Sequence, residues 1–434
     1  MLGEYGSRSS TICRRIGLSE GESAMFGLGV ALFAAGLLLS VALHEFGHFY
    51  PSRKFGVRVS QFMVGFGPTI FSRKRGETEY GLKAIPLGGY VRIIGMIPPR
   101  PEVKRGPFKN LINQARATSM ADLQEQDEGR AFYQLHPAKK LVVMLGGPIM
   151  NLLIAVILLF IALVIIGTPQ PTTKVNSVIT CLPAETTSTG ECTSSAVTSP
   201  AARAGLLPND EIIAINNVGF SNWDELVDRI DHAAGQRIDL TVRRAGSELD
   251  LVVQVANISN DNELDGYLGF TPVVELARQS PVVVFEYVGR VGVATAELII
   301  DLPQRLANIV ATATGAQPRD LDGPISIVGV GVISGDVATQ DAPASWRLLD
   351  FLMLLASVNL ALFFFNLLPI LPLDGGHVAG ATFEWLRRGT KSRHAKDAAD
   401  IAKLMPAAYL FAIALLTFSV LLIYVDLVAP IRLN

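Results

Sequence analysis

Residues 25–43 read MFGLGVALFAAGLLLSVAL, and His44-Glu45-Phe46-Gly47-His48 follows directly. The run carries no charge and is long enough to cross the roughly 30 Å hydrocarbon core of a bilayer as a helix. On that helix His44 and His48 lie one turn apart on one face, where both imidazoles can bind a single metal ion. Glu45 lies beside that face, where it can take a proton from a metal-activated water. The stretch therefore predicts a membrane helix that ends in a metal site.

The same motif has a plainer interpretation, because HExxH also arises by chance in helices. The three polar residues could simply pack a helical bundle or end the first helix. Two histidines and one glutamate at membrane depth are costly, however, unless they have partners and a role. That cost favours a functional site.

Composition indicates an integral membrane protein. The chain has 434 residues, of which half are hydrophobic and only 18% are charged, and its mean hydropathy is +0.37. Three more charge-free runs, at residues 141–166, 351–373 and 404–425, are long enough to span a bilayer. We therefore expect a polytopic α-helical protein with four transmembrane helices.

The charges are distributed unevenly along the chain. Residues 51–140 hold 16 Lys and Arg against 7 Asp and Glu, whereas residues 167–345 hold 10 against 22. The positive-inside rule then puts the first loop in the cytoplasm, the second loop outside, and both termini outside. We interpret the basic loop as a topology signal that contacts anionic lipid, so no nucleic-acid partner is expected.

The first loop alternates apolar and polar residues between glycines, which is typical of β-hairpins. Its glycines include Gly65, Gly67, Gly88 and Gly89. At membrane depth such a sheet must line a cavity or be covered by protein. We expect a membrane-associated hairpin region whose edge binds an extended substrate near these glycines. The polar residues 98–135 predict a mobile or surface segment with one short helix.

The second span contains Gly146-Gly147-Pro148-Ile149-Met150-Asn151. The glycine pair allows another helix to pack closely. Asn151 is a single amide in an apolar span. It can make a hydrogen bond between helices or contact the substrate, and the sequence does not distinguish these roles.

Residues 172–273 have the pattern of a soluble α/β module, with a helix near 223–233 and alternating strands at 238–242 and 249–255. The run SPAARAGLLPND at 199–210 resembles the bacterial, circularly permuted PDZ domain, although Asn209-Asp210 stands where that family usually has Gly-Asp. Such domains bind a peptide end by strand addition, but this one could also be a steric plug without a ligand. Cys181 and Cys192 lie in the part predicted to be outside, where a disulfide would persist.

The third span ends in NLLPILPLDGGH at residues 366–377. Two prolines prevent a regular helix there, so the broken backbone must line a cavity or be covered. Asp374 at this break would complete three protein ligands with His44 and His48, and a catalytic zinc keeps its fourth position for water. His377 is a rival ligand. Asn366 can hydrogen-bond a substrate carbonyl or tie the span to its neighbours.

Together these motifs resemble the site-2 protease family of intramembrane zinc metalloproteases. The resemblance covers residue 25 to the chain end and is greatest to the bacterial regulator-of-sigma proteases, in their actinobacterial branch with one PDZ domain. It implies one zinc ion held by His44, His48 and Asp374, with Glu45 as the general base. It also implies regulated intramembrane proteolysis of single-pass anti-sigma factors in the cytoplasmic membrane, after another protease has trimmed them outside.

Two rival functions can be weighed on the same residues. A non-catalytic membrane adaptor would not need both metal motifs, and a metal transporter would need a polar path that the second and fourth spans do not offer. His and Asp ligands also suit iron or manganese, so zinc rests partly on the resemblance. Met1 and Met25 are both possible starts.

The expected organisation follows from these patterns. An N-terminal extension (1–24) precedes the first span (25–50), the basic loop (51–140) and the second span (141–167). The PDZ domain (172–273), an amphipathic segment (281–345), the third span (346–373), a cytoplasmic loop (374–403) and the fourth span (404–428) follow.

Overall fold

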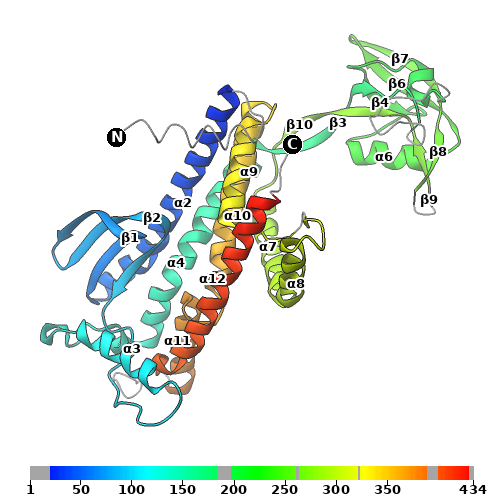
Figure 1. Cartoon of the computed structure of the whole chain (residues 1–434). Coiled ribbons are helices and arrows are strands. Elements are labelled where there is room, and N and C mark those ends of the chain that lie inside the picture. Colours follow the sequence, from blue (N-terminus) through cyan, green and yellow to red (C-terminus); the bar gives the residue numbers. More distant parts are fainter. Residues whose placement is uncertain (1–19, 183–196, 261–262, 321–322, 389–398, 430–434) are drawn as a thin grey trace. The chain divides into compact units, whose positions relative to one another are not determined.

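The computed structural model describes residues 20–182, 197–260, 263–320, 323–388 and 399–429. The chain divides into two compact units (Figure 1). The second unit, Ile166–Gln279, is inserted between the two parts of the first, Met1–Ile165 and Ser280–Asn434. The inserted unit begins where the second apolar run ends.

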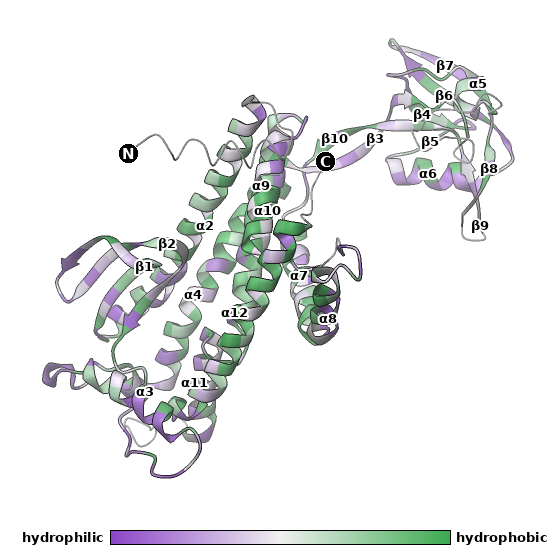
Figure 2. Cartoon of the chain, in the orientation of Figure 1, coloured by the Kyte–Doolittle hydropathy of each residue, from purple (hydrophilic) through white to green (hydrophobic). Residues whose placement is uncertain are grey.

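In its described residues, the first unit is built on four long helices. They are α2 (Glu20–Lys54), α4 (Pro137–Leu159, continued by a π-helical stretch Phe160–Ile166), α10 (Ala344–Asn366) and α12 (Met405–Val428). Each contains a window with a mean hydropathy of 2.2 to 3.3, yet at most 28% of any window is buried by protein. Figure 2 shows these helices hydrophobic along most of their length. Apolar surfaces of this extent would be unstable in water, so they fit a multi-pass membrane protein.

Helices α2 and α4 cross at glycines. A Cβ atom on Gly47 would lie 2.2 Å from the carbonyl oxygen of Gly146, and one on Gly146 would lie 1.9 Å from the carbonyl oxygen of Gly47. No larger residue fits at either position without moving a backbone. The two helices therefore meet at the HExxH motif because the Gly-Gly pair of α4 faces Gly47.

Shorter helices complete the first unit. The expected amphipathic segment contains α7 (Val282–Ile300), α8 (Leu302–Ala313) and the apolar helix α9 (Ile327–Thr339), which packs against α2. The third apolar run stops being helical at Asn366, because Pro369 and Pro372 follow, and the chain turns into α11 (Asp374–Arg388).

Strands β1 (Val59–Arg75) and β2 (Thr78–Ile93) form the sheet of the basic loop. The stretch that contains Gln61 lies between the two ends of β2, with Glu79 on one side and Arg92 on the other. The hairpin thus folds back on itself. Gly65, Gly67 and Gly88 have φ angles of +89°, +82° and +105°, a backbone conformation that favours glycine, and they occupy the bends.

The polar segment that follows is better packed than the sequence suggested. It contains the expected helix, α3 (Lys109–Ala121), but two buried ion pairs tie the segment to the unit. Arg58 Nε lies 2.6 Å from Asp127 Oδ1, and Arg116 lies 2.7 Å from Asp400. A buried charge that lost its partner would cost about 3–5 kcal/mol, so these pairs hold the segment in place.

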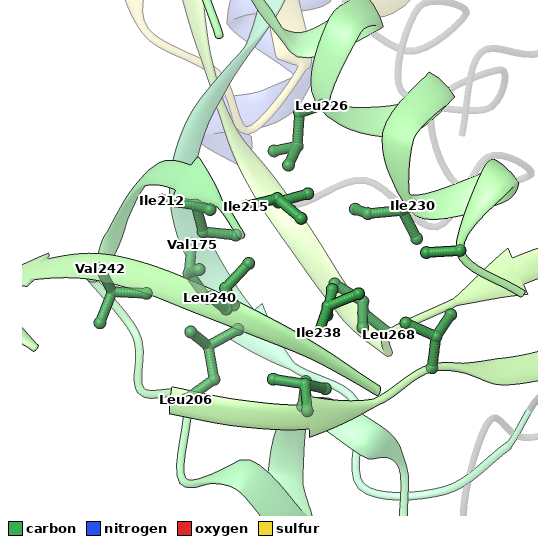
Figure 3. Packing of buried hydrophobic residues seen from close by; sticks show 14 residues of the cluster. Val175, Leu206, Ile212, Ile215, Leu226, Ile230, Ile238, Leu240, Val242 and Leu268 are labelled. Carbon is green, nitrogen blue, oxygen red and sulfur yellow. The ribbon is translucent and has the colours of Figure 1, made fainter. Parts of the chain in front are cut away.

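The second unit contains a six-stranded sheet of order β10-β3-β4-β6-β7, with β5 paired to β4. Its strands are β3 (Thr168–Val178), β4 (Glu211–Ile215), β5 (Val218–Gly219), β6 (Arg237–Arg244), β7 (Ser247–Gln254) and β10 (Phe270–Ala277). Helices α5 (Pro200–Ala204) and α6 (Trp223–His232) and the hairpin of β8 (Ala256–Asn260) and β9 (Glu263–Tyr267) accompany it. Figure 3 shows the core, where Leu226 and Ile230 of α6 meet Ile212, Leu240 and Leu268.

The backbone conformation of residues 199–210 accounts for the residue types found there. Ser199 caps α5 by accepting a hydrogen bond from the Ala202 amide, and Gly205 ends it with a φ of +76°. Asn209 has a φ of +71°, a conformation that asparagine tolerates better than most residues other than glycine. This accounts for asparagine where the resembling family usually has glycine.

Cys181 is buried and disulfide-bonded. Its predicted partner, Cys192, lies outside the described residues, so that pairing stays a prediction. Asn216 and Asn217, with φ angles of +50° and +62°, form a tight turn that connects β4 to β5.

The environment of Asp210 predicts that the stability of the second unit depends on pH. Its carboxylate is buried and accepts hydrogen bonds from Arg244 Nε and Nη2, at 2.7 and 2.6 Å, and from the Leu207 amide. Burial alone would raise the pKa of Asp210, but these donors outweigh it and lower the pKa. The stabilisation is therefore present above the unfolded pKa of about 3.9 and disappears as the pH falls through the lower folded value.

We expect the Asp210→Asn variant to be less stable at about pH 6 by roughly 1.5–3 kcal/mol. Its stability should also change less than that of the wild type between about pH 6 and about pH 3. Urea titrations of the full-length protein measure both effects. Trp346 and Trp385 are replaced by Phe in both proteins, so that the tryptophan fluorescence comes from Trp223 in the second unit. Equal acid sensitivity in the two proteins would exclude Asp210 as the titrating group.

Candidate metal centre

Three side chains from two distant parts of the chain meet at the end of the first apolar run. His44 Nε2 and His48 Nε2 lie 3.3 Å apart, and Asp374 Oδ2 lies 3.3 Å from the first and 3.2 Å from the second. Among the described residues this is the group of His, Cys, Asp and Glu side chains that could hold a metal ion.

The spacing of these atoms fits zinc. A tetrahedral ion with bonds of about 2.0 Å separates its ligand atoms by about 3.3 Å. All three observed separations lie within 0.1 Å of that value. Two imidazoles and one carboxylate also match a catalytic donor set, which leaves the fourth position open.

Asp374 reaches the histidines because the chain turns sharply before it. It is the first residue of α11. A Cβ on Gly375 would lie 2.2 Å from the Leu368 carbonyl oxygen, and one on Gly376 would lie 2.7 Å from the Leu371 nitrogen. The two glycines of the LDGG motif thus let α11 start against the preceding bend, which brings the carboxylate beside α2.

Gly147 is a site residue that the sequence reasoning did not identify. A Cβ there would lie 2.2 Å from His48 Nε2 and 2.8 Å from His44 Nε2. The backbone of α4 therefore borders the ligand atoms directly. The Gly-Gly pair was the available signal, but we interpreted it only as a helix-packing feature.

We expect the Gly147→Ala variant to lose most of its zinc, because the added methyl group overlaps the ligand atom of His48. Helix α4 cannot easily retreat, since Gly146 holds it against Gly47. Metal analysis of the purified protein measures the loss. Gly27→Ala is the control, because a Cβ on Gly27 meets no atom within 4 Å. Full zinc content in Gly147→Ala would contradict this account.

The outer nitrogens of both histidines face α4. His48 Nδ1 lies 2.8 Å from the carbonyl oxygen of Val143, which can only accept, so Nδ1 donates and Nε2 keeps its lone pair for a metal. His44 Nδ1 lies 3.2 Å from Nδ2 of Asn151, which is fully buried. The structure thus brings Asn151, considered from sequence as a substrate contact, against a predicted metal ligand.

Glu45 is buried beside strand β2. A Cβ on Gly89 would lie 2.9 Å from Glu45 Cγ, so this predicted substrate glycine borders the predicted base. Gly88 packs against the ring of Phe66, and Gly65 lies against the carbonyl oxygens of Lys83 and Ile85. Those two glycines, with Gly67, shape the hairpin.

The two remaining candidates lie elsewhere. Asn366 is half-buried at the end of α10 and has no side-chain hydrogen bond among the described residues. His377 is on α11, yet it lines a small cavity with Lys140 and Glu384. The buried Lys140 Nζ lies 2.9 Å from Glu384 Oε2 and ties α11 to α4. His377 is therefore outside the group of three donors.

The model of peptidase family M50 matches residues 32–413. The chain belongs to this family. It is 34% identical to the zinc metalloprotease Rip1 of Mycobacterium tuberculosis over 430 residues, which cover 94% of this chain and 99% of the relative. It is 33% identical to Rip1 of Mycolicibacterium smegmatis, with the same coverage, and 27% identical to the metalloprotease MmpA of Caulobacter vibrioides over 83% of this chain and 88% of the relative.

Membership of family M50 confirms the predicted site-2 protease family, the enzyme class and zinc as the cofactor. The chain is a zinc metalloprotease. Four apolar helices in the described part of the chain also make it a multi-pass membrane protein. Its substrates are therefore expected among membrane proteins.

Proposed function

We propose that this protein is an intramembrane protease that cuts the membrane segment of single-pass proteins. His44, His48 and Asp374 would hold one zinc ion, and Glu45 would be the general base. The observation that carries the proposal is the set of three donor atoms, 3.2 to 3.3 Å apart, at the end of an apolar helix long enough to cross a bilayer.

The chemistry follows from the positions of the side chains. When bound, zinc supplies Lewis-acid polarisation of a carbonyl oxygen and acidifies a water molecule. Glu45, outside the three donors but next to His44, takes the proton from the attacking water and passes it to the leaving amine. Burial of Glu45 against Gly89 restricts bulk water near this proton transfer.

The substrate must be extended to react, because hydrogen bonds within a helix hide the peptide bond. The end of β2 pairs with β1 around Gln61 and also borders α2 through Gly89 and Glu45. A substrate strand added to the sheet here would lie beside the base. In this proposal the hairpin associates with the membrane, Gly65, Gly67, Gly88 and Gly89 shape the binding edge, and Asn366 hydrogen-bonds the substrate carbonyl.

The second unit would be a circularly permuted PDZ domain outside the cytoplasmic membrane, with the metal site toward the cytoplasm. The excess of basic residues before the second span and of acidic residues after it supports this orientation. The capped helix α5 and Asn209 in its left-handed conformation support the domain type. We propose that it excludes substrates with bulky outer domains, so that anti-sigma factors are cut only after an upstream protease trims them.

A paired-substrate experiment tests this proposal. One single-pass anti-sigma-type substrate carries a short outer tail, and its match carries a folded outer domain on the same membrane segment. Purified full-length protein in liposomes should cut only the first. Equal cleavage of both would refute the size filter, and cleavage of neither by zinc-loaded protein would refute the proposed substrate class.

A further inference from the structure

Asn151 lies on α4 and has no exposed surface. Its Nδ2 is 3.2 Å from Nδ1 of His44, whereas its Oδ1 has no hydrogen-bond partner among the described residues. An amide oxygen without a donor is costly in an apolar environment. The side chain is therefore satisfied at one end only.

Metal binding by His44 fixes which end of the amide must face the ring. The His44 atom in the donor group is Nε2, so a metal-binding imidazole carries its proton on Nδ1. An Nδ1–H group facing an NH2 group would set donor against donor. Rotating the amide by half a turn about its own bond places Oδ1 where it accepts a hydrogen bond from His44 Nδ1–H.

His48 provides the precedent within the same site. Its Nδ1 lies 2.8 Å from the carbonyl oxygen of Val143, also on α4. One helix thus faces both outer nitrogens, with a backbone oxygen for one ring and a side-chain amide for the other. Partners of this kind fix the tautomer and orientation of metal-binding histidines.

We propose that Asn151 is a positioning residue of the metal centre, which accepts a hydrogen bond from His44 Nδ1 and thereby holds Nε2 toward the metal. This role replaces substrate contact as the function of Asn151. The inference rests on the metal site proposed above and extends it.

Zinc affinity of the full-length protein in detergent, measured by competition with a chromogenic chelator, tests the role without a substrate. Asn151→Leu removes the acceptor and should weaken zinc binding by roughly 10- to 100-fold. Asn151→Asp keeps an acceptor and loses the donor, so it should bind zinc much like the wild type. Cobalt-substituted protein gives a second readout, since the visible bands of Co2+ should change in Asn151→Leu only.

Asn359→Leu is the matched control. Asn359 is equally buried, its Nδ2 bonds Ser40 Oγ at 3.1 Å, and its Oδ1 also lacks a partner, but it faces no metal ligand. Its zinc affinity should equal that of the wild type. If Asn359→Leu weakens zinc as much as Asn151→Leu does, the effect is general to buried amides and the inference fails.

Failure of the inference and failure of the metal site give different results. If the wild type binds zinc and Asn151→Leu binds it equally well, only the positioning role is refuted. If Asn151→Leu does not fold, loss of zinc from Asn151→Asp refutes the acceptor role by itself. A wild type that binds no zinc would refute the proposed site as a whole.

Discussion

We expect the Glu45→Gln variant to keep its zinc and to lose cleavage by roughly 10²- to 10⁴-fold in kcat, the usual contribution of a general base. Glutamine has the shape of glutamate, so the buried position between α2 and Gly89 is preserved. It cannot accept the proton from water. The metal is retained because Glu45 is not among the three donor residues. Zinc analysis and cleavage rates of the purified protein measure the two effects separately.

Glu79→Gln is the control for this variant. Glu79 accepts a hydrogen bond from Gln61 in the hairpin and lies outside the donor group. Its zinc content and cleavage rate should remain near those of the wild type. Normal cleavage by Glu45→Gln would disprove the general-base role, and loss of its zinc would mean that Glu45 acts as a ligand.

We expect replacement of Asp374 by asparagine to have the second large effect. The variant loses the charge of a proposed ligand whose Oδ2 lies 3.2 to 3.3 Å from both histidine nitrogens. Loss of a hydrogen-bond partner of a metal-binding histidine lowers metal affinity by roughly 10- to 100-fold. We expect Asp374→Asn to lower zinc affinity by more than this, because it changes a ligand itself, and we expect cleavage to disappear with the zinc. Chelator competition measures the affinity.

His377→Gln separates the rival ligands in the same experiment. His377 lines the cavity beside Lys140 and Glu384, so its replacement should leave zinc affinity nearly unchanged. Normal zinc binding by Asp374→Asn together with loss from His377→Gln would reverse the assignment.

The predictable parts of this structure depend on local properties of the chain, such as hydropathy, proline positions and helical spacing. Continuous apolar runs predict the four long helices, since only length and hydropathy matter there. The break at Pro369 and Pro372 follows from the lost amide hydrogens and ring geometry of proline. The pairing of His44 and His48 follows from helical periodicity. Asp374 follows from the motif that ends the third span.

The parts that could not be predicted depend on distance between segments. Gly147 borders the ligand atoms, but glycine has no side chain that could signal chemistry in a sequence. In the sequence, three basic residues look like ordinary surface charges: Lys140, Arg58 and Arg116. The fold buries each of them against one acidic partner. These ion pairs hold in place the segment that was expected to be mobile. The packing could not be predicted because the partner residues lie up to 284 positions away in the sequence.

The fold-back of the hairpin was beyond sequence reasoning for a similar cause. Alternation and glycines predict strands, but they do not say which strand lies beside which. The structure gives Gln61 a neighbour at each end of β2 and brings Gly89 to Glu45. That contact joins the sheet to helix α2 beside the proposed base and supports the proposal of substrate binding by strand addition.

The most direct test of the central claim is the position of the cut in a membrane-embedded substrate. Purified full-length protein and a trimmed single-pass substrate are placed in liposomes, and the products are mapped by mass spectrometry before and after zinc is removed and restored. The account predicts a cut inside the substrate's apolar segment that disappears with the zinc and returns with it. A cut confined to the water-exposed tail, or one that persists in zinc-free protein, would contradict it.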